Sequence, residues 1–337
     1  MQKKLLTMAV ASALAMPAVA FAQSVTVFGT IDGSIRSQSK VNLAAGGTGS
    51  VLTENSGLRT TDRIGFRGSE DLGGGLMANF WMESAHASDT GATTLNTARK
   101  SVVGLSKGGN SVDLGRDYTV NFKSQGIYDP MSYTYTGVTP TATTNVAGTR
   151  SSNMVTAGFR FGTGGVRVDY ALGEVVDESW GTRIGAMADF AFGPVTVTGA
   201  YSTVKDAATG TLSTDTMNFG GAYRMGAFTF RAGWSNTEAE TVAGDAESPL
   251  LVLGAQYAIS PTLNGRIGYY DLKTEVAGTE TGKSKLFIIA LDYALSKRTT
   301  AYVEFDRRTL DGGFNSGVAG TLADGATAIG AGIAHSF

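Results

Sequence analysis

The sequence predicts an all-β fold, a 16-stranded antiparallel β-barrel that spans a membrane. Three patterns lead to this prediction. From Gln23 onward, apolar and polar residues alternate with period two, and a helical period is almost absent. The alternating runs are joined by connections that are short and long in turn, and aromatic residues of the apolar face recur at one end of the runs. A soluble β-sandwich would instead hide its large apolar face between two sheets.

The first 22 residues have the character of a secretory signal peptide. Two lysines precede the apolar stretch Leu5–Val19, and Ala20–Phe21–Ala22 places small residues where a signal peptidase reads. We therefore expect residues 1–22 to be removed and residues 23–337 to form the barrel. A short buried N-terminal helix is the alternative.

The composition restricts the remaining classes of protein. The 337 residues include no cysteine, so an exported chain gains no stability from disulfides. Of the 27 basic residues two lie in the leader, so the 29 acidic residues of the whole chain outnumber the basic residues of the mature one. This balance implies neither nucleic acid nor an anionic membrane surface as a partner.

The first strand and the first hairpin show the alternation most clearly. In the first strand one face is polar apart from Phe28, and the other carries Val25, Val27, Gly29, Ile31, Gly33 and Ile35. Residues 63–84 read RIGFRGSEDLGGGLMANFWMES, two alternating runs around a glycine-rich turn. We expect the large apolar residues of this hairpin to face lipid and its charged residues to face the lumen.

The later elements follow from the positions of the connections. Seven short ones are expected at Glu70–Gly75, Lys107–Asn110, Gly162–Gly165, Phe192–Pro194, Met225–Gly226, Ile259–Thr262 and Leu295–Thr299. Eight long ones are expected at Ser37–Gly57, Ala87–Thr97, Asp117–Thr149, Asp177–Trp180, Asp206–Thr214, Glu238–Glu247, Glu275–Lys283 and Leu310–Gly325, the fourth being brief. Fifteen connections join sixteen strands, and closing the sheet satisfies every backbone group inside the membrane.

An aromatic girdle supports the membrane assignment. Tyr223, Tyr257, Tyr293 and Phe337 share the lipid-facing parity and the same end of successive strands. Chance enrichment of tyrosine in strands is the alternative.

Several separated motifs make the chain similar to a known family. RIGFRGSEDLGGGL, VVGLS (102–106), LGRDY (114–118), DYALSKRT (292–299) and the terminal GIAHSF resemble the general porins of Gram-negative beta-proteobacteria. The resemblance implies a homotrimer of 16-stranded barrels in the outer membrane, in contact with its lipid and lipopolysaccharide. It also implies the passage of small hydrophilic solutes and ions, and a C-terminal Phe that the assembly machinery reads.

In the resembled family the third long loop folds into the barrel and narrows it. The matching segment is Asp117–Thr149, the longest expected connection. It contains five aromatic residues but only Asp117, Lys123 and Asp129 as charges, so it can rest on a lumen wall without burying many ions. An ordinary exposed surface loop is the alternative.

Five residues are candidates for the constriction. Arg36, Arg63 and Arg150 match positions where wall arginines of the resembled family face the folded loop, and Glu83 and Asp129 are acids of the wall and of the loop. Since a narrow channel focuses the field of the charges at its waist, we expect a weak preference for anions. The alternative for each arginine is a solvated wall charge balanced by a neighbouring acid.

Enzyme motifs find no support. Residues 104–108, GLSKG, match a nucleophile elbow in letters only, because a short turn and no helix follows. The two histidines, His86 and His335, lack the second ligand or carboxylate that metal or triad chemistry needs. We therefore expect that the protein is not an enzyme and that it binds no cofactor. A sugar- or organic-anion-specific channel, and an adhesive or structural barrel, remain as alternatives to passive diffusion.

Overall fold

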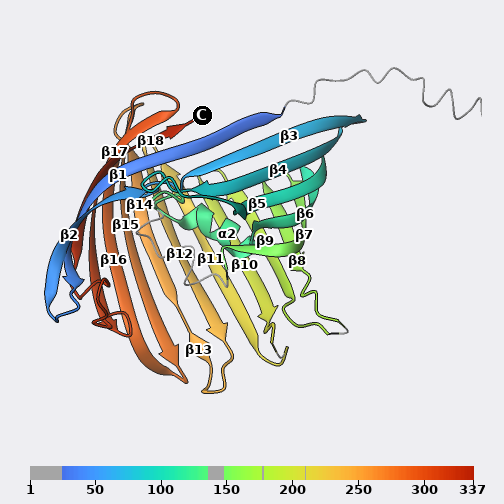
Figure 1. Ribbon diagram of the computed structural model, residues 1–337. Coiled ribbons are helices and arrows are strands. Elements are labelled where there is room, and N and C mark those ends of the chain that lie inside the picture. The colour runs from blue at the N-terminus through green and yellow to red at the C-terminus, as the bar shows by residue number, and fades with distance from the viewer. Residues whose placement is uncertain (1–24, 136–147, 177, 209) are drawn as a thin grey trace, which may run out of the picture.

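A computed structural model describes residues 25–135, 148–176, 178–208 and 210–337, without the side chains of residues 93–98. The expected signal peptide, residues 1–22, lies outside the described residues, as does part of the third long loop. Within the described chain one sheet closes on itself around a short internal helix (Figure 1).

The predicted 16-stranded antiparallel barrel is confirmed. The sheet consists of β1 (Thr26–Asn42), β2 (Thr48–Ser56), β3 (Arg63–Gly73), β4 (Leu76–His86), β5 (Thr93–Lys107), β6 (Asn110–Tyr118), β7 (Arg150–Phe161), β8 (Gly164–Ala171), β9 (Arg183–Phe192), β10 (Val195–Lys205), β11 (Ser213–Met225), β12 (Phe228–Ala239), β13 (Ala246–Glu247), β14 (Leu250–Ala258), β15 (Leu263–Val276), β16 (Thr279–Ala294), β17 (Thr299–Gly312) and β18 (Thr327–Ser336). β2 and β3 both pair with β1, and β13 and β14 both pair with β12 and β15, so each couple is one interrupted strand.

The first and last strands close the barrel. β1 pairs with β18 from Thr30 opposite Ser336 to Gln38 opposite Ala328. Beyond this ladder, the backbone N–H of Gly29 donates to the carbonyl of Phe337 and the N–H of Phe337 donates back, each at 3.1 Å. A side chain at Gly29 would collide with the Phe337 ring, because its Cβ would lie 2.3 Å from that ring. The closed sheet leaves no edge strand.

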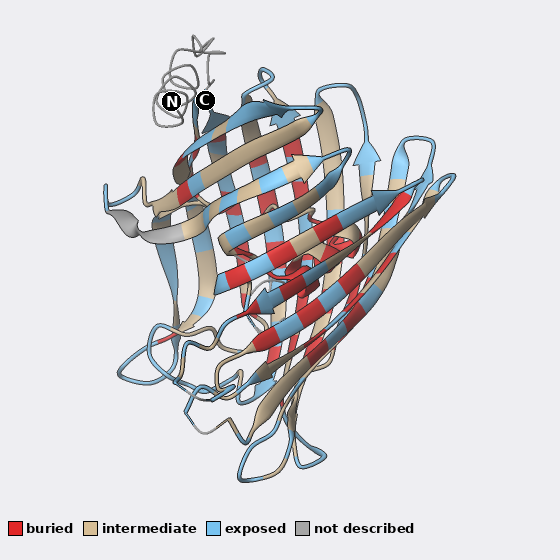
Figure 2. Ribbon diagram, turned by 90° about the vertical axis from the view of Figure 1, so that its right-hand side faces the viewer, coloured by how far each residue is buried: buried red, intermediate tan, exposed pale blue. Residues whose placement is uncertain are grey.

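The two faces of the wall differ as the alternation predicts. Figure 2 shows buried and exposed residues alternating along the long strands. On β16, Phe287, Ile289 and Leu291 point outward and are 37–42% exposed, whereas Leu286 and Ile288 point inward and are almost fully buried. The girdle residues Tyr223, Tyr257, Tyr293 and Phe337 are all exposed, at 41–49%, on the outer face.

Part of the inner face is apolar, which the sequence did not indicate. A buried core lies inside the barrel, between the inner face of the later strands and inward-folded segments of the chain. Its wall residues include Leu250, Val252, Tyr270, Leu272, Leu286 and Ile288, and its inserted residues include Leu58, Tyr128, Met131 and Tyr135. The lumen is therefore filled on this side.

Several expected connections differ in length from those of the structure, and three differ most. The segment 37–57 is mostly strand, with only residues 43–47 between β1 and β2, and the β15–β16 connection is the two residues 277–278. In contrast, the connection between β8 and β9 runs from 172 to 182. Strands that extend beyond the lipid need no apolar outer face, so the period-two signal disappears although the hydrogen-bond ladder continues.

Candidate channel constriction

The third long loop enters the barrel as a helix. α2 (Val120–Tyr128) begins at Thr119, whose Oγ1 accepts a hydrogen bond from the N–H of Phe122. It is the helix inside the barrel in Figure 1 and packs on the inner faces of β8 to β12. None of the described helices is long and apolar enough to cross a membrane.

Polar side chains of the wall hold both ends of α2. At its start, the carboxylate of Asp169 accepts a hydrogen bond from the N–H of Val120 at 2.8 Å. At its end, the guanidinium of Arg231 donates to the carbonyls of Gly126 and Ile127, at 3.2 and 2.7 Å. The dipole of a helix stabilises a cation near its C-terminus and a carboxylate near its N-terminus. These contacts give Asp169 and Arg231 a structural role in holding the helix on the wall.

Glycines of the inner face make room for the loop. The ring of Tyr128 lies on Gly220 of β11 and Gly233 of β12, where an added Cβ would lie 2.5 and 2.2 Å from its carbons. Three further inward glycines meet the loop in the same way: Gly185 at Val120, Gly254 at Pro130 and Gly268 at Met131. Because a larger residue at any of these positions would collide with the loop, the glycines form its seat.

We expect Gly233→Leu to displace the loop and leave the barrel closed. Overpacking of this kind costs about 1–3 kcal/mol, and Tyr128 can escape it by leaving the seat, whereas the strand ladder does not need to move. Single-channel recording should show an altered and noisier conductance. Gly265→Leu, at an outward glycine of β15 whose Cβ would meet atoms no closer than 3.5 Å, is the matched control. Identical traces for both variants would contradict the seat.

After α2 the loop turns on a buried carboxylate. Asp129 is fully buried and accepts hydrogen bonds from the Tyr270 hydroxyl and from the N–H groups of Met131 and Tyr133. Burial raises the pKa of Asp129, and these donors offset the effect only partly. Ser132, Tyr133 and Tyr135 have positive φ angles of 52–60°, a conformation that costs free energy in non-glycine residues. Asp129 therefore holds the turn by accepting hydrogen bonds from its backbone, and it is buried and does not face the channel.

Two aromatic rings of the loop stack with an aromatic ring at the end of β6. The ring of Phe122 stacks between those of Tyr118 and Tyr133, with centroid distances of 4.8 and 4.3 Å. The guanidinium of Arg150 lies over the Tyr118 ring at 4.3 Å and donates a hydrogen bond of 2.7 Å to its hydroxyl. This stack fixes Arg150 between loop and wall.

A recess of about 670 Å³ separates the stack from β3 and β5. Its lining includes the cations Arg63, Arg99, Lys123 and Arg150. Glu83 accepts a hydrogen bond from Arg99 at 2.6 Å and lies 3.8 Å from Arg63. Asp117 binds Lys123 at 2.7 Å and Lys100 at 3.2 Å. Five cations thus meet two carboxylates around this recess, which leaves its local charge positive.

The sequence did not indicate Arg99 as a residue of the lumen, because a β-bulge brings it to the inner face of the wall. Its number gives it lipid-facing parity, opposite to that of Lys100. In the structure Glu83 pairs with Lys100 and Ser84 pairs with Ala98, so Arg99 is the extra residue of the bulge. Both Arg99 and Lys100 therefore reach carboxylates of the inner face.

Of the five predicted residues, Arg63, Glu83 and Arg150 lie together at the recess. Arg36 and Asp129 lie elsewhere. Arg36 forms ion pairs with Glu304, at 3.1 Å, and with Asp306 on the neighbouring wall, and only 11% of its side chain is exposed. Two buried carboxylates thus compensate its charge, whereas Asp129 is covered by its own loop.

A second segment, residues 57–62 between β2 and β3, also turns into the barrel. The buried carboxylate of Asp32 accepts hydrogen bonds from the N–H groups of Arg59 and Thr60, at 2.8 and 2.7 Å. This directs Arg59 to Asp292, which also binds Arg266 and the Tyr135 hydroxyl. The third loop is therefore tied to the wall at both α2 and Tyr135.

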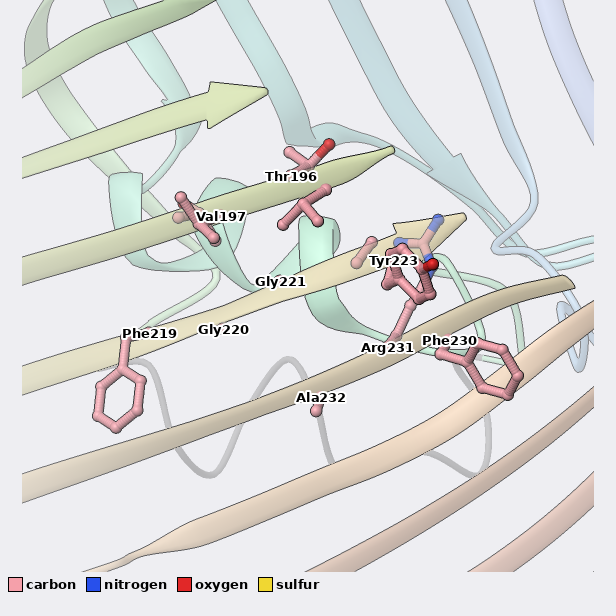
Figure 3. Close-up of a pocket in the computed structure, with 12 residues that line it drawn as sticks. Thr196, Val197, Phe219, Gly220, Gly221, Tyr223, Phe230, Arg231 and Ala232 are labelled. Carbon is pink, nitrogen blue, oxygen red and sulfur yellow. The ribbon is translucent and has the colours of Figure 1, made fainter. Parts of the chain in front are cut away.

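A recess on the outer wall does not belong to the channel. It has about 510 Å³ and lies over β10 to β12, with Phe219, Tyr223 and Phe230 around it and Val197 and Ala232 among its lining residues (Figure 3). These three aromatic side chains are 40–54% exposed on the lipid-facing side. Its apolar lining suits contact with hydrocarbon chains.

Within the described ranges no group of three or more histidine, cysteine or acidic side chains is placed to bind a metal ion. The GLSKG stretch lies at the end of β5, and Gly108 and Gly109 form the tight turn to β6. A closed antiparallel wall with an apolar outer face and a narrowed, charged lumen defines a membrane channel.

The comparisons identify the family. Residues 8–313 match the family described as Gram-negative porin. The chain is 32% identical over 326 residues to outer membrane porin protein 32 of Delftia acidovorans, with 90% of this chain and 88% of that protein covered. The chain therefore belongs to the Gram-negative porin family and is an outer-membrane channel protein, which confirms the resemblance to beta-proteobacterial porins.

Solved structures agree with this assignment. The anion-selective porin from Comamonas acidovorans superposes with a TM-score of 0.79 at 26% identity, covering 94% of this chain and all of that one. A trimer form of OmpT of Vibrio cholerae superposes with a TM-score of 0.70 at 15% identity, again over 94% of this chain and all of its own. The second likeness concerns the fold alone.

Proposed function

We propose that the protein lets small hydrophilic solutes and ions diffuse passively across the outer membrane, with a weak preference for anions and no catalytic role. The observation that carries this proposal is the excess of cations around the recess, where Arg63 and Arg99 share the carboxylate of Glu83 and Arg150 lies on the ring of Tyr118. The solved relative whose title names an anion-selective porin supports the same sign.

The net charge of the chain does not decide the preference. Several acids, such as Glu240, Asp245 and Asp324, lie in the connections between strands. Salt screens the fields of such exposed charges beyond about 8–10 Å. An ion in the recess is within a few ångströms of the cations and is surrounded by low-dielectric walls, which focus their field. The preference is weak because Glu83 and Asp117 compensate part of the positive charge.

The alternatives predict different permeation. A sugar-specific channel would present aromatic rings along its length. The aromatic side chains of Phe28, Trp81, Tyr270 and Tyr302 point inward from the strands. Of these, Tyr270 and Tyr302 are buried and donate hydrogen bonds to Asp129 and Asp32. Phe28 and Trp81 contact each other at 5.0 Å beneath the guanidinium of Arg67. The four therefore form no continuous track.

Liposome swelling and planar-bilayer recording together test the proposal. Sugars of graded size should enter liposomes at rates that fall with size and depend little on stereochemistry. The zero-current potential in a potassium chloride gradient should have the sign of anion preference. An adhesive barrel would admit no sugar, and a substrate-specific channel would admit one class of solute far faster than others of equal size.

The preference should decrease at alkaline pH. Burial lowers the pKa of the Lys123 ammonium group below its ordinary value of 10.5, an effect that Asp117 only partly offsets. As pH rises through this lowered pKa, Lys123 loses its charge and the recess loses a cation, so the zero-current potential should shift toward cation preference. Lys123→Arg, which keeps its charge, should remove the shift. An equal shift in that variant would assign the titration to another group.

We also propose a homotrimer in contact with outer-membrane lipid and lipopolysaccharide. The outer face of β1 combines small and slender residues, including Val27 and Gly33, that allow apolar walls to approach closely. Gly29 serves a different purpose, because it accommodates Phe337 of the same chain. Unheated detergent extracts should contain a species three times the mass of the monomer, and a monomer alone under mild conditions would contradict the proposal.

A further inference from the structure

One cation of the inner wall is compensated by no carboxylate of the wall. Arg67 of β3 is exposed, and its direct neighbours across the ladder are Thr26 of β1 and Trp81 of β4. Among the residues that the structure describes, none forms an ion pair or a hydrogen bond with its guanidinium. Arg36, by contrast, is held by two buried carboxylates. The positive charge of Arg67 therefore remains available to a solute.

Two aromatic rings fix the position of this guanidinium. The Cζ atom of Arg67 lies 5.3 Å from the ring centroid of Phe28 and 5.1 Å from that of Trp81. The two rings meet at 64°, so they form a corner in which the guanidinium rests. Gly65 makes room for this corner, because a Cβ there would lie 2.5 Å from the Phe28 ring. A cation held on aromatic faces loses little further freedom when it forms hydrogen bonds.

The corner lies between the recess and the periplasmic mouth. Arg67 follows Arg63 by four residues on the same face of β3, which is about 13 Å along the strand toward the short turn after Gly73. Short turns lie at the periplasmic end of such barrels. Trp81 also connects the two places, since the Nζ of Lys100 lies 5.2 Å from its ring centroid. On this part of the wall, Arg67 is thus the next cation beyond the recess.

We propose that Arg67, stacked on Phe28 and Trp81, is a second binding site in the lumen and that it is selective for solutes carrying a carboxylate. A guanidinium presents its N–H groups in a planar fork, which matches the two oxygens of a carboxylate with two parallel hydrogen bonds. Chloride is a single atom and cannot fill both arms of the fork. The inference rests on the proposed passage of anions and names the class of anion that this site retains.

The site retains carboxylates without excluding other solutes. Arg67 is exposed on one wall, so sugars and chloride can pass beside it. Conduction requires that a solute bind strongly enough to enter a site and weakly enough to leave it. A single guanidinium with no second cation in its corner meets both requirements. At the recess several cations act through charge alone, whereas at Arg67 the shape of the anion also matters.

Quenching of Trp81 fluorescence tests the site directly. The chain has three tryptophans, and the background variant Trp180→Phe/Trp234→Phe leaves Trp81 as the only one. Trp180 lies in the connection between β8 and β9, and Trp234 lies on the outer face beside Phe219, so the lumen wall is unchanged. Single-channel conductance equal to that of wild type verifies this background. Trichloroacetate, a carboxylate that quenches tryptophan, is compared with its neutral counterpart trichloroethanol.

We expect trichloroacetate to quench Trp81 more strongly than trichloroethanol does. Arg67→Gln in the background variant should lower the ratio of the two quenching constants on the order of tenfold, because it removes a pair of charge-assisted hydrogen bonds. The ratio corrects for any change in the exposure of the indole ring. Arg67→Lys keeps the charge but lacks the fork, so it should retain the wild-type zero-current potential and recover little of the quenching ratio.

Arg224→Gln is the matched control. Arg224 is also an exposed cation that lines the lumen, but it belongs to β11, which pairs with neither β3 nor β4. Its removal should leave the quenching ratio unchanged. Equal ratios in Arg67→Gln and its background, or a full ratio in Arg67→Lys, would overturn the inference. If the channel still prefers anions, that result removes this site alone, whereas a cation-preferring wild type contradicts the proposed function.

Discussion

Deletion of residues 121–143 is expected to raise the single-channel conductance while the barrel stays closed. The deletion removes α2 and the turn on Asp129, which occupy the lumen, but it spares the ladder in which Tyr118 of β6 pairs with Arg150 of β7. The remaining residues of the loop are enough to connect these two strands. The recess then merges with the rest of the lumen.

The same deletion should lower thermal stability. The loop covers apolar side chains of the wall such as Leu250, Val252 and Ile288, and exposing each to water costs about 1.5–3 kcal/mol. The melting temperature should therefore fall although the β-sheet circular dichroism at room temperature is retained. Unchanged conductance in a correctly folded deletion variant would show that the loop does not narrow the channel.

Replacing Arg63, Arg99 and Arg150 together by glutamine should reverse the ion preference. One unit charge about 4 Å from an ion changes its energy by about 1 kcal/mol even at the dielectric constant of water. Three such changes, reduced by screening, should alter the anion-to-cation permeability ratio on the order of tenfold. Glu83 would then be the dominant charge beside the recess. The zero-current potential in a salt gradient measures this, and the shift should be largest at low ionic strength.

Two further variants separate this effect from general charge loss. Arg307→Gln removes a positive charge from the lipid-facing side of β17, so it should leave the potential unchanged. Arg36 is held by Glu304 and Asp306 away from the recess, so it should contribute less to selectivity than Arg63 or Arg150. A triple variant with the wild-type potential would assign the selectivity to other groups, with Lys100 and Lys123 the next candidates.

Strand parity was enough to predict the barrel because lipid imposes the same requirement on every outward position. The outward side chains of β16 alternate with inward ones along the whole membrane-spanning part, and this regularity is visible in the sequence. The resemblance then directed attention to the third loop. Where strands leave the lipid the requirement ends, so the extension of β1 and β2 beyond the membrane had no sequence signal.

The constriction was predicted only in part. The parity of a residue in a strand predicts which face of the wall its side chain lies on, but not which residues it contacts. Arg63 and Arg150 reach the recess. Arg36 also lies on the inner face, but it forms ion pairs with Glu304 and Asp306, which lie near the other end of the chain. Arg99 depends on a single extra residue that no pattern of hydrophobicity reveals. The glycine seat of Tyr128 also requires knowledge of which strands lie beneath the loop.

The apolar core inside the barrel divides the wall into halves that should tolerate change differently. Inward positions of β14 to β16 are buried against the loop, so substitutions there act on folding and yield. Inward positions of β3 and β5 face the recess, so substitutions there act on permeation. A bacterium under selection by a toxic solute could therefore adjust its permeability through one half of the barrel while the other half keeps the protein assembled.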